Sequence, residues 1–246
     1  MKIIPIHQWS PSKVKTFNEC KFRFQLQYGQ KIPEPERPLP PGKTEHANDR
    51  GTRIHEVAER YCRGTGPFAP EMHKFRTEFE SLKTLFSQGM AEFEGEWAHD
   101  KRWTPVPWKS KEAWVRLKLD ALVHLSPIEA VVIDYKTGKK FGNEIAHAEQ
   151  TQAYQLVTFL RYPKLEIVHT ELWYLDLDEI TITTFTRQQG MRFKPVIERK
   201  GNAITNATEF PPNANLFSCR FCLYGTRPAT DRSPAGTGHC DKGVWK

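Results

Sequence analysis

The sequence predicts an α/β protein in which a mixed central β-sheet is flanked by helices. Apolar residues recur at helical spacing over most of the first ninety residues, and from Val115 to Asp120 they alternate with polar ones, which indicates a half-buried strand. The short apolar run Ala130-Val131-Val132-Ile133 then indicates a central strand that is covered on both faces. The resulting order of helices, strands, helix, strands and helix favours a mixed α/β core.

The first half of the chain is predicted to be mainly helical. Ser10 is a suitable N-cap residue, a proline follows it at the first helical position, and Gly29 is a plausible end for this helical segment. Five prolines within residues 31–48 predict an extended loop. Apolar stripes at helical spacing then predict helices over 51–63 and 72–93.

Strands and helices alternate in the second half. The predicted elements are a strand ending at Asp120, a strand ending at Asp134, a helix at about 144–160, strands near 165–177 and 180–186, and a helix at about 188–200. A coil rich in proline and asparagine then leads into a C-terminus that carries cysteines. Because the sequence contains no internal repeat, we expect one domain over residues 1–246.

Composition and charge exclude several classes of protein. A chain of 246 residues with 38% hydrophobic and 12% aromatic residues is long and apolar enough to fold around a core, which excludes a miniprotein or a disordered chain. Its longest apolar stretches fall short of the roughly 18 residues that a membrane helix needs, so we expect a soluble, cytoplasmic protein. The formal net charge of +7 favours a polyanionic partner.

Two aspartates at the ends of neighbouring strands are the candidate metal ligands. Asp120 ends one strand, and Asp134 ends the buried strand as part of Asp134-Tyr135-Lys136. Alternate residues of a strand project to the same face, so Asp134 and Lys136 lie together and Tyr135 points away. Paired carboxylates suit Mg²⁺ or Mn²⁺, which polarise a phosphate and lower the pKa of a bound water. The Lys136 ammonium would orient that water or stabilise the negative charge that develops.

A purely structural ion pair between Asp134 and Lys136 is the alternative, because a buried carboxylate needs a partner in either case. Two polar pairs at helical i, i+4 spacing favour the metal site, since they could add an imidazole, an acid, an amide and a phenol to it. These pairs are His55 with Glu59, and Gln150 with Tyr154.

Together these motifs resemble those of the PD-(D/E)XK nuclease superfamily, specifically its RecB-like branch, which includes phage-type members and CRISPR adaptation nucleases. The resemblance lies in Gly51-x3-His55, Asp120, Asp134-Tyr135-Lys136, Gln150-x3-Tyr154 and the opening segment from Trp9 to Gly29. It implies a restriction-endonuclease-like core. The metal ligands that it implies are His55, Asp120, Asp134 and the Tyr135 carbonyl. It also implies that Lys136 is the catalytic lysine and that Gln150 and Tyr154 support the site or contact DNA.

Five cysteines, an odd number with one C-x-x-C pair, favour metal ligation over a disulfide framework. Cys219 and Cys222 form that pair and need two more ligands for a tetrahedral zinc site or an iron–sulfur cube. The sequence offers Cys20, Cys62, Cys240 and His239. Cys62 lies in the apolar stripe of its helix, so we expect it in the core.

The resemblance also suggests how the cysteines are used. RecB-like nucleases that are similar to this chain hold a 4Fe-4S cluster with one N-terminal and three C-terminal cysteines. By position, this implies Cys20, Cys219, Cys222 and Cys240 as ligands, with residues 1–30 and 205–246 forming the cluster region. A Zn²⁺ site and unligated thiols are the alternatives, and either metal would be structural.

The resemblance implies a Mg²⁺- or Mn²⁺-dependent deoxyribonuclease whose partner is single- or double-stranded DNA. An exonuclease of recombination, repair or phage DNA metabolism fits best. A non-catalytic nucleic-acid-binding module with the same fold, or an enzyme that acts on another phosphodiester or nucleotide, would be the alternative. Candidate phosphate contacts are Lys139, Lys140, Arg50, Arg53 and Arg116.

Overall fold

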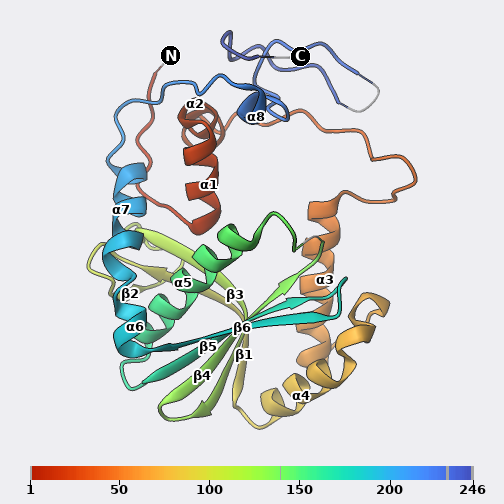
Figure 1. Cartoon of the computed structure of the whole chain (residues 1–246), viewed down its shortest axis with the longest axis vertical. Helices are drawn as coiled ribbons and strands as arrows, with labels where there is room; N and C mark the ends of the chain where they lie inside the picture. The colour runs from red at the N-terminus through yellow and green to blue at the C-terminus, as the bar shows by residue number, and fades with distance from the viewer. Residues whose placement is uncertain (1, 139, 231–232, 245–246) are drawn as a thin grey trace. The chain divides into compact units, whose positions relative to one another are not determined.

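A six-stranded mixed β-sheet forms the centre of residues 47–197 in the computed structural model (Figure 1). The strand order is β2-β1-β3-β4-β5-β6; β4 and β5 pair in parallel, and the other neighbours pair antiparallel. The strands are β1 (Ala91–His99), β2 (Pro105–Val106), β3 (Val115–Ser126), β4 (Glu129–Lys136), β5 (Ile167–Tyr174) and β6 (Glu179–Thr186). The predicted α/β class with a mixed sheet and flanking helices is confirmed.

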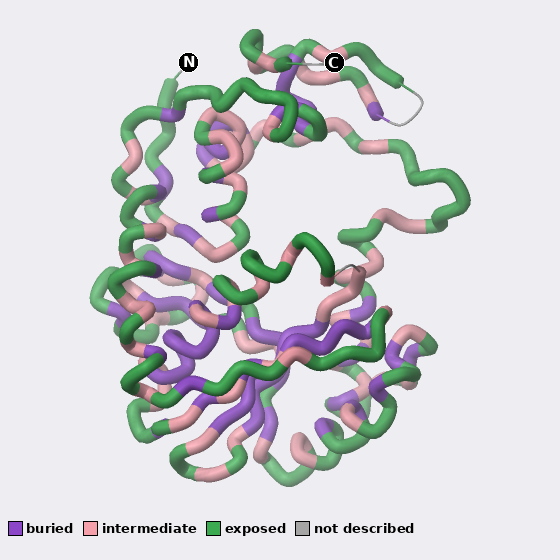
Figure 2. The backbone as a smooth tube through the Cα atoms, viewed as in Figure 1, coloured by how far each residue is buried: buried purple, intermediate pink, exposed green. Residues whose placement is uncertain are grey.

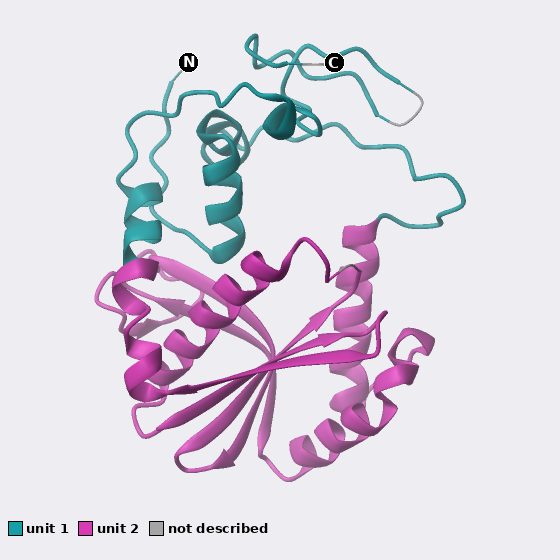
Figure 3. Ribbon diagram, viewed as in Figure 1, with its two compact units in different colours: residues 1–46, 198–246 teal, residues 47–197 magenta. Residues whose placement is uncertain are grey.

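The structure describes residues 2–138, 140–230 and 233–244 and divides into two compact units (Figure 3). Unit 1 comprises residues 1–46 and 198–246, and unit 2 comprises residues 47–197. The helices are α1 (Pro11–Glu19), α2 (Lys21–Phe24), the π-helical turn η1 (Gln25–Gly29), α3 (Ala47–Cys62), the 3-10 turn η2 (Pro70–Phe75), α4 (Arg76–Ser87), α5 (Glu144–Arg161), α6 (Arg187–Met191), α7 (Lys194–Thr205) and α8 (Leu216–Cys219).

Strand β4 lies at the centre of the sheet because its sequence is apolar on both faces. It pairs with β3 on one side and β5 on the other, and its residues from Ala130 to Tyr135 are all buried. Helix α5 connects β4 to the parallel strand β5, as a parallel pair requires. This connection leaves Asp134 and Lys136 at the C-terminal end of β4. The predicted strand end at Asp120 is wrong, because β3 continues to Ser126 and Asp120 lies within it.

Helices α3 and α4 cover one face of the sheet and form the main core of unit 2 with it (Figure 2). The helices contribute aliphatic and aromatic side chains, and the sheet contributes odd-numbered residues of neighbouring strands, as the period of two requires. The sheet residues of this core include Phe93, Ala121, Val123, Val131, Ile133, Tyr135 and Trp173. Burial of Cys62 in this core confirms its expected place.

The predicted helix over 72–93 is wrong in its last part. Helix α4 stops at Ser87, Gly89 adopts a left-handed φ of +72°, and strand β1 begins at Ala91. Phe93 therefore reaches the core from a strand rather than from a helix. The predicted helix over 188–200 is two helices, α6 and α7.

Unit 1 brings segments from both ends of the chain together. Phe17 packs edge-on against Phe24 at 5.2 Å between ring centres, and Phe210 stacks on Phe24 at 6.5 Å. The Tyr224 hydroxyl donates to the Ile32 carbonyl oxygen at 2.8 Å. The expectation of a single domain over the whole chain stays a prediction. Within the described residues, every helix is too short or too polar to cross a membrane.

His99, at the end of β1, is a buried titratable group outside the candidate active site. Its side chain has no solvent exposure, and neither ring nitrogen has a hydrogen-bond partner among the described residues. Burial, together with the charge of Arg161, lowers the pKa of His99 to about 4. Protonation of this ring is therefore disfavoured in the folded state.

We expect the free energy of unfolding to fall as the pH drops from about 6.5 to about 4, because the unfolded chain binds the His99 proton first. The expected slope from this residue is about 1.4 kcal/mol per pH unit. Urea unfolding of His99→Phe across this range should give a shallower slope than wild type. His7→Phe, which changes an exposed histidine, should retain the wild-type slope. Equal slopes for wild type and His99→Phe would contradict the assignment.

Candidate active site

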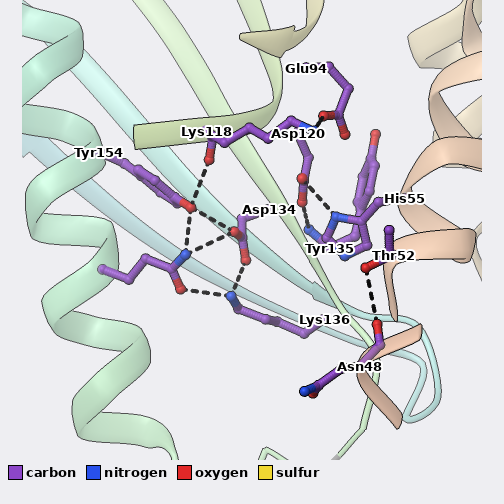
Figure 4. A network of polar contacts seen from close by, with 11 residues as sticks. Asn48, Thr52, His55, Glu94, Lys118, Asp120, Asp134, Tyr135, Lys136 and Tyr154 are labelled. Carbon is purple, nitrogen blue, oxygen red and sulfur yellow. Dashed lines mark hydrogen bonds and ion pairs between the residues drawn. The ribbon is translucent and has the colours of Figure 1, made fainter. Parts of the chain in front are cut away.

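Asp120 and Asp134 lie on neighbouring strands, and only 7% and 5% of their surfaces are exposed (Figure 4). The Asp120 carboxylate is held by two contacts. His55 Nδ1 lies 2.8 Å from Asp120 Oδ1, and the Tyr135 backbone N–H donates to Asp120 Oδ2 at 2.6 Å. His55 comes from α3, so its place beside Asp120 follows from the packing of that helix on the sheet.

Glu94 joins His55 and Asp120 in a possible metal site. The ligand atoms of these three side chains all lie within 4.8 Å of one another. Phe93 pairs with Ala121 and Gly95 with Leu119, so Glu94 lies opposite Asp120 in the register of β1 and β3. Glu94 also has a left-handed φ of +51°, which is strained for a residue with a side chain, and it forms an ion pair with Lys118.

A separate set of contacts surrounds Asp134. Lys136 Nζ lies 2.5 Å from Asp134 Oδ2 and donates to Gln150 Oε1 at 2.7 Å. The Tyr154 hydroxyl donates to Asp134 Oδ1 at 3.0 Å, and Gln150 Nε2 donates to the same oxygen at 3.3 Å. Gln150 and Tyr154 come from α5, whereas His55 comes from α3, and Figure 4 shows these helices on opposite sides of the two aspartates.

Burial and neighbouring charges change the acid–base properties of this region. Burial raises the pKa of Asp120, and the nearby charge of Asp134 adds to this effect. Burial would lower the pKa of His55, but the hydrogen bond to Asp120 and the surrounding carboxylates outweigh it, so the pKa is raised. Burial also raises the pKa of Tyr154 well above its usual value, which keeps the hydroxyl protonated as a donor to Asp134. A divalent cation would relieve the crowding of negative groups here.

The structure brings together most of the predicted site residues but separates Glu59 from them. His55, Asp120, Asp134, Lys136, Gln150 and Tyr154 all take part in the contacts above. Glu59 instead accepts from Arg63, the residue that follows α3, at 2.7 Å. The Tyr135 ring points into the core against Phe79 and Trp173, as its alternation with Asp134 and Lys136 predicts. A metal-ligating role of the Tyr135 carbonyl stays a prediction.

Sequence analysis missed Glu94. The predicted helix over 72–93 takes in the start of β1, and no strand is predicted for the residues that follow, so Glu94 is not among the candidate ligands. The signal was nevertheless in the sequence, because Glu92, Glu94 and Glu96 alternate with apolar or small residues from Phe93 to Trp97. Gly89, just before this segment, marks the end of the helix.

Several of the predicted phosphate contacts are basic residues that already have protein partners. Arg50 forms a two-pronged ion pair with Asp176 at 2.7 and 2.9 Å, and this lowers the pKa of Asp176. The other partners are Glu71 for Arg53, Glu179 for Lys140 and the ring of Trp108 for Arg116. Lys139 lies outside the described residues. Phosphate contacts by these residues stay predictions.

Gly51 allows α3 to approach the end of β4 closely. A Cβ atom built on Gly51 would lie 3.1 Å from Thr137 Oγ1, one residue after Lys136. Such a separation is tighter than an ordinary van der Waals contact. Gly51 is one turn before His55, so this close approach helps to set the position of His55 relative to the strand that carries Asp134.

In unit 1, four cysteines line a single pocket. They are Cys20, Cys219, Cys222 and Cys240. The backbone N–H groups of Arg23 and Asn213 donate to Cys20 Sγ at 3.5 and 3.4 Å. The pocket thus collects the four thiols that the sequence resemblance implied, together with N–H donors aimed at one of them.

Cys240 reaches this pocket although 17 residues separate it from Cys222. Its backbone N–H donates to the Tyr224 carbonyl oxygen at 2.7 Å, and Gly225 and Cys240 form a parallel β-bridge. The two ends of the intervening segment therefore lie close together. His239, the other candidate, hydrogen-bonds through Nδ1 with Thr237 Oγ1 at 2.7 Å.

Comparison of the sequence with family models gives a match over most of the chain. The model of the PD-(D/E)XK nuclease superfamily matches residues 8–227, which include every predicted site residue except Cys240. Among curated proteins, none has a matching sequence.

Solved structures with similarity to this chain include two with low scores. One is the crystal structure of SSO0001, with 15% identity, a TM-score of 0.41, and coverage of 91% of this chain and 86% of that one. The other is an alkaline exonuclease, LHK-Exo, from Laribacter hongkongensis, with 12% identity, a TM-score of 0.33, and coverage of 82% and 88%. At these scores the structural similarity is weak, so the family assignment rests on the sequence match.

We expect the effect of Gly51→Ala to depend on Thr137. Alanine favours a helix by about 0.5–1 kcal/mol relative to glycine, but in the wild-type background the contact with Thr137 offsets this gain. In a Thr137→Ala background, Gly51→Ala should increase the free energy of unfolding by about 1 kcal/mol. Urea unfolding of the two single variants and the double variant measures this coupling. Additive effects would contradict the proposed close approach.

Proposed function

Because the chain belongs to the PD-(D/E)XK nuclease superfamily, we propose that it is a Mg²⁺- or Mn²⁺-dependent deoxyribonuclease that hydrolyses phosphodiester bonds in DNA. The observation that carries this proposal is that the ligand atoms of His55, Glu94 and Asp120 all lie within 4.8 Å of one another. The strand that carries Asp120 pairs with the strand that carries the Asp134–Lys136 ion pair. We further propose that it acts as an exonuclease in recombination, repair or phage DNA metabolism.

The side chains fit a hard divalent cation. Asp120 and Glu94 supply carboxylate oxygens, and His55 supplies an imidazole. Asp134 lies on the adjacent strand, outside this group of three, and its role as a further ligand stays a prediction. When bound, the cation polarises the scissile phosphate and lowers the pKa of a coordinated water.

Lys136 is the proposed catalytic lysine. An ammonium group has three N–H donors, and two of them are directed to Asp134 and Gln150 in these contacts. These two contacts fix the direction of the third N–H donor. In this role Lys136 would orient the attacking water or stabilise the negative charge on the phosphate as the bond to phosphorus forms.

Gln150 and Tyr154 act as positioning residues in this proposal. Gln150 accepts from Lys136 and donates to Asp134, so one amide group fixes both members of the ion pair. Tyr154 donates to Asp134 and accepts from Gln150, which fixes the amide orientation. Because both side chains come from α5, the helix after β4 determines the geometry of the pair.

Loss of Asp134 or Lys136 should abolish most cleavage while DNA binding remains. We expect Asp134→Asn and Lys136→Met to lower the cleavage rate by at least about 100-fold. Lys136→Met removes the ammonium that stabilises developing negative charge, and Asp134→Asn removes the carboxylate that holds this ammonium in place. The assay uses single- and double-stranded DNA labelled separately at the 5′ and 3′ ends, with Mg²⁺ or Mn²⁺. In the same assay, Glu94→Gln should raise the Mn²⁺ concentration for half-maximal cleavage by about tenfold.

Matched substitutions on exposed turns control for general effects. Lys101→Met and Asp178→Asn make the same chemical changes away from the site and should cleave as wild type does. Asparagine also tolerates the left-handed φ of +59° at position 178. DNA binding by the wild type without cleavage in either metal would refute the nuclease proposal and favour a non-catalytic binding module.

We also propose that Cys20, Cys219, Cys222 and Cys240 hold a 4Fe-4S cluster. Support comes from the pocket that the four thiols share and from the backbone N–H donors that face Cys20, since such donors stabilise sulfur ligands of a cluster. The role of the cluster would be structural, because these thiols belong to unit 1 and the candidate active site belongs to unit 2.

Anaerobically purified protein should absorb near ~400 nm and contain iron. Cys240→Ser should lose this absorption and lower the melting temperature, because metal binding and folding are coupled. Cys62→Ala is the matched control, since Cys62 is buried in the core of unit 2, and it should retain the absorption. Bound zinc without absorption, or no bound metal, would contradict the cluster.

A further inference from the structure

Unit 1 exposes two phenylalanine rings near the C-x-x-C pair. Phe217 is 95% exposed and Phe221 is 60% exposed, although aromatic rings of this size are usually buried. Both line a surface pocket with three arginines. We name this surface the Phe–Arg patch and define it as Arg37, Phe217, Arg220, Phe221 and Arg227.

Hydrogen bonds hold the backbone of the patch from two sides. The Arg37 guanidinium donates to the Phe221 carbonyl oxygen at 2.5 Å, and Arg227 donates to the Arg220 carbonyl oxygen at 3.0 Å. Arg37 comes from a segment far away in the sequence, so the contact fixes the C-x-x-C turn against the N-terminal part of unit 1. The exposed Phe221 ring is therefore presented by a constrained turn.

The charged side chains of the patch are all arginines, and one of them, Arg37, also forms an ion pair with Glu34 at 3.5 Å. Arg220 lies over the Phe221 ring, with its guanidinium carbon 5.1 Å from the ring centre. The described residues that line the pocket include three arginines and no carboxylate. A surface of this kind attracts a polyanion.

We infer that the Phe–Arg patch binds single-stranded nucleic acid by stacking unpaired bases on Phe217 and Phe221. Aromatic rings in a basic groove recognise single strands, because the faces of unpaired bases are accessible whereas a duplex hides them. Arginines beside the rings bind the phosphates and add cation–π contacts. The inference rests on the proposed function for the class of substrate, and it adds a binding site in unit 1 outside the candidate active site.

Protein interfaces are also rich in aromatic residues and arginine, so binding of a single strand must be distinguished by its chemistry from binding of a protein. A base requires a flat ring, whereas an apolar protein contact accepts an aliphatic side chain of similar size. Substitution of Phe217 by leucine or tryptophan therefore separates stacking from a general apolar contact. Because Phe217 is almost fully exposed, these substitutions should not affect folding.

The test is fluorescence anisotropy of a labelled thymidine oligonucleotide, with a blunt duplex of equal length as the comparison, in EDTA so that cleavage does not contribute. The single strand should bind more tightly than the duplex. Phe217→Ala and Phe221→Ala should each raise the Kd for the single strand by about tenfold, and Phe217→Leu should do the same. Phe217→Trp should retain wild-type affinity.

Arg220→Ala should raise the Kd and make the affinity less dependent on salt concentration. Arg102→Ala removes an arginine whose side chain is 89% exposed in unit 2, and it should leave the Kd unchanged. Wild-type affinity in the Phe217→Ala, Phe221→Ala double variant would overturn the inference, as would full affinity of Phe217→Leu. The anisotropy measurement contains no free metal, so it is independent of cleavage. Absence of cleavage by the wild type would refute the nuclease proposal, but it would not change the result of the binding measurement.

Discussion

The candidate active site depends on two carboxylates that are buried on adjacent strands of one sheet. Removal of a single carboxylate from water costs several kcal/mol unless it is compensated, and a second negative charge nearby increases the cost. Asp120 and Asp134 are both almost fully buried, and the pKa of Asp120 is raised by burial and by its neighbour. The surrounding structure must therefore supply positive charge and hydrogen-bond donors at these two positions.

The two buried aspartates are stabilised by different groups, and the helices that supply these groups lie on opposite sides of the pair. Asp120 receives an imidazole from α3 and a backbone N–H from β4. Asp134 receives a lysine from its own strand, together with a phenol and an amide from α5. A lysine thus accompanies Asp134 and another, Lys118, pairs with Glu94, whereas Asp120 has only an imidazole and a backbone N–H. This asymmetry favours cation binding on the Asp120 side and a fixed lysine on the Asp134 side.

Local patterns were sufficient to predict most of this arrangement. The apolar run before Asp134 predicts a central strand, and alternation predicts that Lys136 shares a face with Asp134 while Tyr135 points away; both are confirmed, and the Tyr135 ring lies in the core. The alternation around Glu94 indicates a strand, but it does not identify Glu94 as a ligand, because Glu94 approaches Asp120 only through the pairing of β1 with β3 and through a strained backbone conformation. Glu59 was a candidate for the site that the structure places elsewhere. The i, i+4 spacing fixes its position on α3, but it does not determine that its side chain turns toward Arg63.

The C-x-x-C turn of unit 1 belongs both to the proposed 4Fe-4S site and to the Phe–Arg patch. When Cys219 and Cys222 turn their thiols toward one pocket, the two residues between them must face outward, which accounts for the exposure of Arg220 and Phe221. This geometry does not require an aromatic residue at position 221, and it places no demand on Phe217, which precedes the pair. An exposed ring costs solvation free energy that a polar residue would avoid. Two such rings among arginines are therefore better explained by a ligand with flat faces and negative charge than by the needs of the proposed cluster alone.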